Sequence, residues 1–291
     1  MTSEFNAHPV REKYQDFDGK NKEQMSLLLA DNRYPMFTTQ VFEERVLGRG
    51  IGRYVGTGDL VAYDGLKKDD QEVKIILTAN RSGLTKVGRF ALGLINPQSA
   101  YINGAVNLNQ ARDAQGKEVK EVYNTLSGNG VIALKRKDFG ILNQDMTQEQ
   151  RLNHKGWRIL ARHPDEVPKE FAEDFEAFKE YNVNVVSPQY DNAMGFYLAD
   201  GEKVPTLRAW YVCGLVGYWW SRASGDANLV GDGGGLVGVA PEAPNALDIN
   251  VQQVKAYSSE DLVAFDNAVR GLESVLNPAL LRPFQQLRSK L

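Results

Sequence analysis

The sequence predicts an α+β protein in which helices flank an irregular mixed sheet. Three observations lead to this class. Helical periodicity occurs before residue 48, short β-type runs between turn residues fill residues 48–143, and helical periodicity returns from residue 147 onward. No internal repeat and no obvious linker divides the chain.

The first 47 residues predict a polar tail followed by helix. Residues 1–22 are polar and of mixed charge, and we expect them to form an N-terminal tail. Lys22–Ala30 combines good helix formers with helical periodicity and predicts a short helix. Phe37–Leu47 has apolar residues at helix-like spacing, although an extended segment fits it equally well.

The middle of the chain predicts strands. Val73–Leu77 is rich in β-branched residues, and Leu60–Tyr63 is an apolar run between Gly-Asp and Asp-Gly pairs, which is typical of a hairpin. Val87–Ile95 and Gly130–Leu134 are further strand candidates, and Gln110–Glu121 is polar enough to be a loop.

Helices follow. Thr147 and Gln150 match a capping box that begins a helix running to Leu160. Pro164–Tyr181 predicts a second helix, because three phenylalanines share one face and should be core: Phe171, Phe175 and Phe178. Residues 258–276 and 279–291 predict a C-terminal helical extension. Residues 23–291 are therefore expected to form one domain with a helical extension at about 258–291.

Composition excludes several classes. A formal net charge of −3 and a pI of about 5.8 argue against a general nucleic-acid binder. The single cysteine, Cys213, allows no intramolecular disulfide and no cysteine-based zinc site. No N-terminal apolar run and no stretch of ~20 apolar residues occurs, so we expect neither a secretory signal nor a membrane span, and a cytoplasmic protein by default.

Catalytic motifs are also missing, so no catalytic residue, metal or cofactor is expected. The three histidines are not spaced as a metal-binding pair: His8, His154 and His163. Cys213 has no charged neighbour in sequence that would activate its thiol. The glycine-rich Gly48–Gly52 and Gly231–Gly235 lack the strand and helix context of a phosphate-binding loop.

The most unusual stretch is Trp210–Gly238. It contains three of the four tryptophans and eight of the 27 glycines, and it has no lysine or glutamate. Such a mixture resembles a paratope, in which Trp and Tyr supply rigid contact area while Ser, Gly, Asn and Asp supply adaptable polar contacts. The flanks, Thr206–Trp210 and Leu236–Pro241, predict strands of one sheet.

We expect the polar and aromatic residues of this stretch to share one solvent-facing, ligand-binding surface. Four apolar residues should face inward and fix the backbone: Leu215, Leu229, Leu236 and Val237. The expected binding residues are Tyr211, Cys213, Gly214, Val216, Gly217, Tyr218, Trp219, Trp220, Arg222, Ser224, Asp226, Asn228, Val230, Asp232, Gly233 and Gly235.

Three segments resemble the C-terminal part of archaeal variable proteins of diversity-generating retroelements: Tyr190–Gly195, Arg208–Trp210 and Gly235–Ala243. The segment Tyr54–Tyr63 agrees with them loosely. The resemblance implies a C-type lectin fold, a variable region at about 208–239, and ligand binding by residues that an error-prone reverse transcriptase has altered at adenines. The composition fits, since adenine changes in Asn codons give Tyr, Ser, Gly and Asp, and a changed AGG codon gives Trp.

Three functions remain open at this point. The first is a non-enzymatic protein that binds a protein or other macromolecule through the diversified surface, expected to be a monomer. The second is an enzyme on a lectin-like scaffold of the formylglycine-generating type. The third is a structural interaction module whose Gly-rich loop packs against its own helices.

Overall fold

The computed structural model describes one of the two compact units into which the chain divides, Met1–Pro241. The expected C-terminal helices belong to the other unit, Glu242–Leu291, and lie outside the described residues. The described residues are 13–50, 52–65, 70–80, 83–199, 202–215, 221–226, 228–231 and 235–240.

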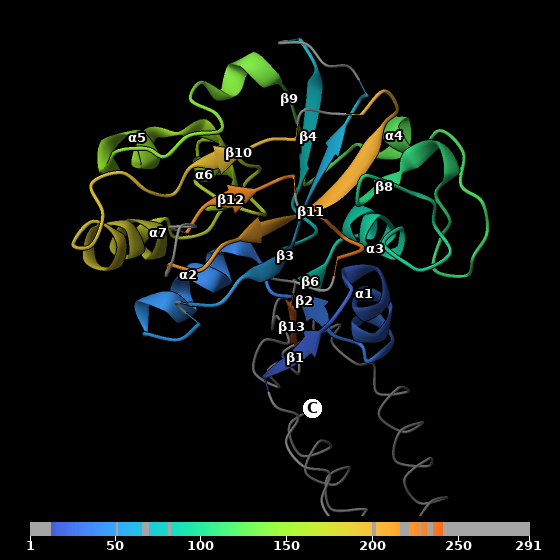
Figure 1. The fold of residues 1–291 in the computed structure, drawn as a ribbon, viewed down its shortest axis with the longest axis horizontal. Helices are drawn as coiled ribbons and strands as arrows, with labels where there is room; N and C mark the ends of the chain where they lie inside the picture. Colours follow the sequence, from blue (N-terminus) through green and yellow to red (C-terminus); the bar gives the residue numbers. More distant parts are fainter. Residues whose placement is uncertain are drawn as a thin grey trace, which may run out of the picture. The chain divides into compact units, whose positions relative to one another are not determined.

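The described part is built on a mixed sheet of eleven strands (Figure 1). Its centre is the antiparallel pair β3 (Val55–Tyr63) and β11 (Thr206–Val212). On one side of β3 lies β13 (Gly235–Val239), which runs parallel to it and pairs with β1 (Tyr14–Asp18). Thus the flanks of the Trp-rich stretch, β11 and β13, belong to one sheet, as predicted, with β3 between them.

Shorter strands complete this sheet. β12 (Ala223–Ser224) pairs antiparallel with β11 and parallel with β10 (Phe196–Tyr197). β4 (Glu72–Ile76) joins β3 to β9 (Val131–Lys135), so both predicted strands in this region are confirmed. The remaining strands are β2 (Tyr34–Pro35), β7 (Tyr101–Ile102) and β8 (Ala105–Asn107), with β5 (Ala79–Asn80) and β6 (Gly83–Leu84) in a separate pair.

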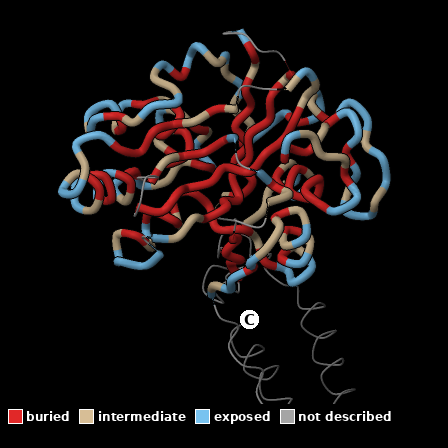
Figure 2. The backbone as a smooth tube through the Cα atoms, in the orientation of Figure 1, coloured by how far each residue is buried: buried red, intermediate tan, exposed pale blue. Residues whose placement is uncertain are grey.

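Two hydrophobic cores cover opposite faces of the sheet, because neighbouring residues of a strand point to opposite faces. On β11, Trp210 and Val212 belong to the first core, whereas Leu207, Ala209 and Tyr211 belong to the second. The central strands are consequently buried along most of their length (Figure 2).

The first core is covered by α2 (Thr38–Val46), α6 (Lys155–Leu160), α7 (Glu176–Glu180) and the π-helix η3 (Tyr181–Val186). Three helices supply buried residues to the second core: α1 (Asn21–Ala30), α3 (Lys86–Gly93) and α4 (Val122–Thr125).

Several helix predictions are confirmed. α1 matches the first predicted helix, and α2 shows that the second segment is helical. Thr147 caps α5 (Gln148–Asn153) by accepting a hydrogen bond from the Gln150 amide, as the capping box predicts. The helix then breaks at His154 and continues as α6. Two short 3₁₀ turns, η1 (Leu108–Gln110) and η2 (Arg136–Phe139), complete the helical elements of the described part.

The strand predicted at Val87–Ile95 is wrong, because most of these residues form α3. The Thr85 hydroxyl caps this helix by accepting from the Gly88 amide. A Cβ on Gly88 would lie 1.8 Å from the Thr78 carbonyl oxygen, so the helix rests directly on the chain just after β4. A short apolar run fits a buried helix as well as a strand, and here the helix covers the second core.

The tail and the phenylalanine-bearing helix also need correction. Tyr14–Asp18 is not a tail but strand β1, which buries Phe17 against the second core. Of Pro164–Tyr181, only α7 is α-helical. Pro168 disfavours helix at the preceding residue, so the chain turns there. The three phenylalanines are nevertheless buried, as expected: Phe171, Phe175 and Phe178.

Candidate binding surface

The first half of the Trp-rich stretch is closed at its base by main-chain hydrogen bonds. The Cys213 amide donates to the Arg222 carbonyl oxygen at 2.9 Å, and the Ser221 amide donates to the Gly214 carbonyl oxygen at 3.0 Å. These bonds continue the pairing of β11 with β12. The two ends of the segment 215–221 are therefore brought together by backbone atoms, whatever side chains lie between them.

Buried and half-buried side chains from distant elements fix the same two ends. Arg45 of α2 donates to the Val212 carbonyl oxygen at 3.2 Å and to the Ser221 hydroxyl at 2.9 Å. The Tyr181 hydroxyl on η3 lies 2.7 Å from the Ser221 hydroxyl. The Tyr190 hydroxyl donates to the Leu215 carbonyl oxygen at 2.9 Å. We call Arg45, Tyr181 and Tyr190 the clamp.

The second half is held in the same manner. The Tyr63 hydroxyl donates to the Gly225 carbonyl oxygen at 2.9 Å, and Arg208 donates to the Asp226 carbonyl oxygen at 3.1 Å. The Leu229 amide donates to the Gly104 carbonyl oxygen, and its own carbonyl oxygen accepts from the Lys22 amide. The backbone after β12 is thus held at Gly225, Asp226 and Leu229.

The four predicted anchors are buried: Leu215, Leu229, Leu236 and Val237. Between them, Asp226 and Asn228 are exposed, whereas Arg222 and Val230 are half-buried. The Asn228 side-chain oxygen accepts from the Val230 and Gly231 amides, so this residue also forms a local turn. That these positions bind a ligand stays a prediction.

Other expected surface positions are buried, and their predicted exposure is wrong. Tyr211 and Cys213 are 1 % and 0 % exposed, because β11 is covered on both faces. The Tyr211 ring packs against the tilted Tyr54 ring, with centroids 4.7 Å apart, and its hydroxyl is hydrogen-bonded to Asn21. Ser224 is 8 % exposed, since it pairs with Tyr211 in the neighbouring strand.

The two glycines among these positions are buried for a different reason. A Cβ on Gly214 would lie 2.5 Å from the Gly52 carbonyl oxygen. One on Gly235 would lie 3.0 Å from both Arg53 and Asp18 side-chain atoms. Gly214 is therefore a close backbone approach, and Gly235 is covered by the side chains of Arg53 and Asp18. The other expected binding residues lie outside the described residues: Val216, Gly217, Tyr218, Trp219, Trp220, Asp232 and Gly233.

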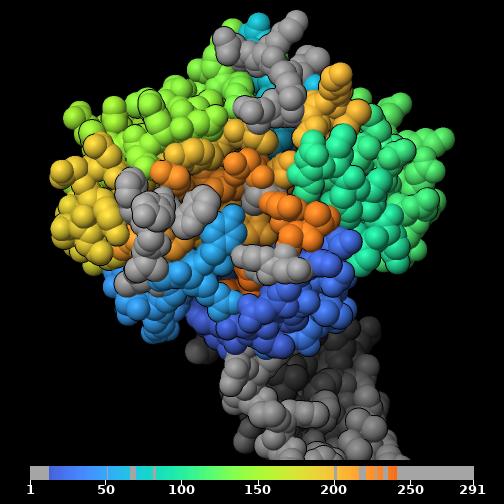
Figure 3. Space-filling view, in the orientation of Figure 1, coloured from blue at the N-terminus to red at the C-terminus, as the bar shows by residue number. Residues whose placement is uncertain are grey.

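Three residues of this region were not predicted from the sequence: Tyr54, Asp145 and Tyr197. Arg222 forms a two-pronged ion pair with Asp145, at 3.0 and 2.8 Å, and its guanidinium lies 4.9 Å from the centre of the Tyr197 ring. Tyr197 of β10 pairs with Ser224 of β12, and the two strands are parallel. The side chain of Tyr197 therefore lies on the same face of the sheet as that of Ser224. Tyr54 is half-buried, and its ring packs against that of Tyr211. The residues around β12, coloured orange, reach the surface in Figure 3. We call Tyr54, Asp145, Tyr197, Arg222 and Asp226 the β12 surface.

The charges of this region follow from burial and pairing. Burial raises the pKa of the Cys213 thiol to about 11, against the lowering effect of its hydrogen bond with Ser224. The thiol is therefore protonated at neutral pH and a weak nucleophile. The hydrogen-bonded Asp145 carboxylate raises the pKa of the Arg222 guanidinium, so the guanidinium stays charged. Within the described ranges, no three His, Cys, Asp or Glu side chains gather in an arrangement that could hold a metal ion.

Comparison with known proteins gives one structural likeness. No protein-family profile matches the chain, and no curated protein matches it significantly in sequence. The chain is similar to a solved structure described as "Accommodation of massive sequence variation in Nanoarchaeota by the C-type lectin fold". The TM-score is 0.48 at 16 % sequence identity, over 79 % of this chain and 99 % of that one. No helix in the described part of the chain has the length and apolar character needed to cross a membrane.

Proposed function

We propose that this chain is a ligand-binding protein that presents interchangeable side chains on a fixed backbone. The ligand would contact the β12 surface and residues 216–220. The scaffold is proposed to be of the C-type lectin type, and the stretch Trp210–Gly238 to be diversified by a retroelement. The sequence resemblance and the paratope-like composition of this stretch support the proposal.

One structural observation carries the proposal. Besides the bonds within the stretch, bonds from residues outside it end mainly on its backbone atoms, at Val212, Leu215, Gly225, Asp226 and Leu229. A hydrogen bond to a carbonyl oxygen does not itself use the side chain of that residue, although at Gly225 a Cβ would lie 2.8 Å from the Trp210 ring. A frame of this kind suits a protein that must accept many replacements without unfolding, given a total stability of only about 5–15 kcal/mol.

The state of Cys213 supports a non-enzymatic role over the cysteine-dependent alternative. Its side chain is fully buried, and its protonated thiol lacks the electropositive, partly exposed setting of reactive cysteines. The packed-loop alternative depends on Trp219 and Trp220, and replacing both residues with alanine separates it from the binding proposal.

A combinatorial library tests the proposal directly. Residues 216–220 together with Asp226, Asn228 and Val230 are randomised in the full chain, displayed on yeast and selected for binding to streptavidin. We expect most clones to be displayed folded and a few to bind after selection. A matched library at the buried anchors Leu215, Leu229 and Leu236 should be displayed poorly. Equal loss of display in both libraries would refute the tolerant-frame proposal.

The origin of the diversity has a separate test. Sequencing the DNA around the gene should reveal a reverse-transcriptase gene and an imperfect repeat of the segment encoding Trp210–Gly238. The repeat should differ from the gene only at its adenines. A neighbourhood without either feature would contradict diversification while leaving ligand binding open.

A further inference from the structure

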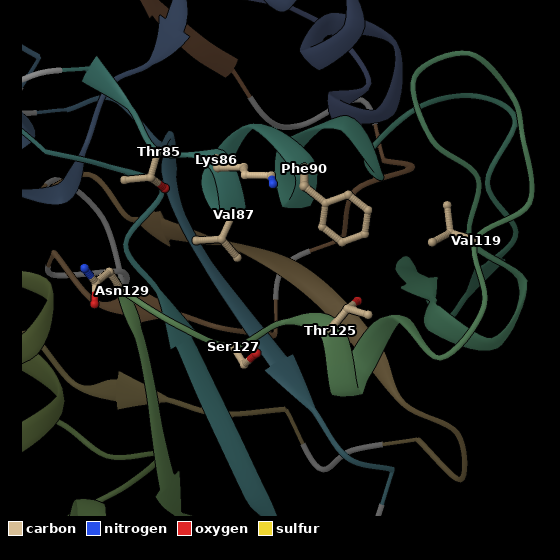
Figure 4. A pocket seen from close by; sticks show the side chains of 8 residues that line it. All are labelled: Thr85, Lys86, Val87, Phe90, Val119, Thr125, Ser127 and Asn129. Carbon is tan, nitrogen blue, oxygen red and sulfur yellow. The ribbon is translucent and has the colours of Figure 1, made fainter.

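A cavity of ≈ 530 Å³ opens on another part of the described unit, between α3 and the chain around α4 (Figure 4). Pockets of ≈ 300–1,000 Å³ are typical of small-molecule sites. Its described lining is formed by Thr85, Lys86, Val87, Phe90, Val119, Thr125, Ser127 and Asn129. None of these residues belongs to the β12 surface, so a ligand in this cavity would bind independently of the proposed function.

The interior of the cavity is apolar. Val87, Phe90 and Val119 pack against the second core but remain half-buried, so each keeps an unfilled apolar face. In Figure 4 the side chains of Val87 and Phe90 project from α3 toward the opposite wall, where Thr125 and Ser127 lie. An apolar ligand that covers these faces would remove them from water at a gain of roughly 25 cal/mol per Å².

Both walls are fixed before any ligand binds. On one side, Gly88 of α3 sits against the Thr78 carbonyl oxygen, and the Thr85 hydroxyl donates to that same oxygen at 3.1 Å. On the other, Lys74 donates to the carbonyl oxygens of Tyr123 and Leu126, at 2.9 and 3.0 Å. A cavity with such walls is pre-formed, which lowers the entropic cost of binding.

The polar groups at the rim favour an anion. Lys86 is exposed beside the cavity, and none of the described lining residues is acidic. The Thr85 and Thr125 hydroxyls already donate to main-chain carbonyl oxygens, so they are poor donors for a ligand. The Lys86 ammonium is therefore the group with which an anionic end would pair, while Ser127 and Asn129 lie exposed at the mouth.

We propose that this cavity binds a small molecule with an apolar chain or ring and a single anionic group. The apolar part lies against Val87, Phe90 and Val119, and the anion lies beside Lys86. A medium-chain carboxylate has this chemistry.

Calorimetric titration of the full chain with decanoate, below its micelle concentration, tests the site. We expect one decanoate per chain, with affinity falling about fourfold for each methylene removed from the ligand. Lys86→Gln should weaken decanoate about two- to fivefold and leave decanol unchanged, since the ion pair is exposed. Arg89→Gln, an exposed change on the same helix outside the lining, should alter neither ligand.

Filling the cavity gives the second arm. Ser127→Trp should abolish decanoate binding. Lys120→Trp, at an exposed position outside the lining, is the control and should not abolish it. If Ser127→Trp is unstable, Asn129→Trp replaces it as the test variant. The proposal is overturned if decanoate gives no saturable binding, or if the filled variant binds as before. It is also overturned if the chain self-associates in sedimentation and Ser127→Trp abolishes this, because the cavity would then receive a second copy.

Discussion

Two consecutive stretches of the chain are held in different ways. Strand β11 is buried at every position, and its side chains fill both cores. The segment after it, from Cys213 to Gly231, is held mainly through its backbone by bonds from the clamp, Tyr63 and Arg208. In the first stretch the identity of the side chain determines stability. In the second, the described residues also receive hydrogen bonds on backbone atoms, a support that does not use their side chains.

The largest expected difference in stability is between replacing Trp210 and replacing Trp219 and Trp220. Trp210 is fully buried, with its ring 4.7 Å from that of Phe196, and its replacement by alanine should lower the free energy of unfolding by about 3–5 kcal/mol. Replacing Trp219 and Trp220 together with alanine should leave the melting temperature nearly unchanged but remove ligand binding. Thermal and urea unfolding monitored by circular dichroism measure the stability of both variants, and titration with a library-selected ligand measures binding.

The outcome for the Trp219 and Trp220 double variant decides between two hypotheses. If it unfolds as readily as Trp210→Ala, both rings contribute to the core, and the packed-loop alternative replaces the binding proposal. If only Trp210→Ala is destabilised, the contrast between the two stretches is confirmed.

The clamp should show the next largest effect. Arg45 is 1 % exposed and donates to the Val212 carbonyl oxygen and the Ser221 hydroxyl, so Arg45→Met removes two buried hydrogen bonds and should cost about 2–4 kcal/mol. Arg49→Met is the control on the neighbouring turn. Its side chain is 63 % exposed and its ion pair with Glu44 should contribute less than about 1 kcal/mol. Similar urea midpoints for the two variants would contradict the assigned role of Arg45.

How much of this arrangement the sequence predicts depends on the kind of signal. Leu215 and Leu229 are apolar residues in a mixed, glycine-rich run, and both are buried, as predicted. The burial of Tyr211 and Cys213 could not be predicted in this way, because a strand covered on both faces loses the alternation that marks an exposed side.

The frame itself has no local signature. Arg45 and Ser221 are 176 positions apart in the chain, and Tyr63 and Gly225 are 162 apart. Only the pairing of β3 with β11 brings such residues together, and periodicity carries no information about it. The same limitation applies to α3, whose apolar run fits a strand until its contact with Thr78 is known.

A moderate effect is expected at Cys213. Its Sγ atom is buried and lies 3.6 Å from the Ser224 hydroxyl, so Cys213→Ser places a second hydroxyl in an apolar setting. We expect a loss of about 1–3 kcal/mol. In the native protein the thiol should react with a disulfide reagent only as fast as the chain opens. Rapid labelling of folded protein, with unchanged stability of the serine variant, would show that Cys213 belongs to the surface after all.

The smallest effect on stability should come from Asp226, a residue whose side chain and backbone can be tested separately. Its side chain is exposed, while its carbonyl oxygen accepts a hydrogen bond from Arg208. Asp226→Ala removes only the side chain, so unfolding free energy should change by no more than about 0.5 kcal/mol. Arg208→Met removes a donor that is 5 % exposed and should cost several times more, because the carbonyl oxygens of Asp226 and Asn103 both lose a partner. Equal costs for the two variants would mean that the side chain of Asp226, and not its backbone, holds this part of the segment. The tolerant-frame proposal would then fail at Asp226, where side-chain support and backbone support can be measured separately.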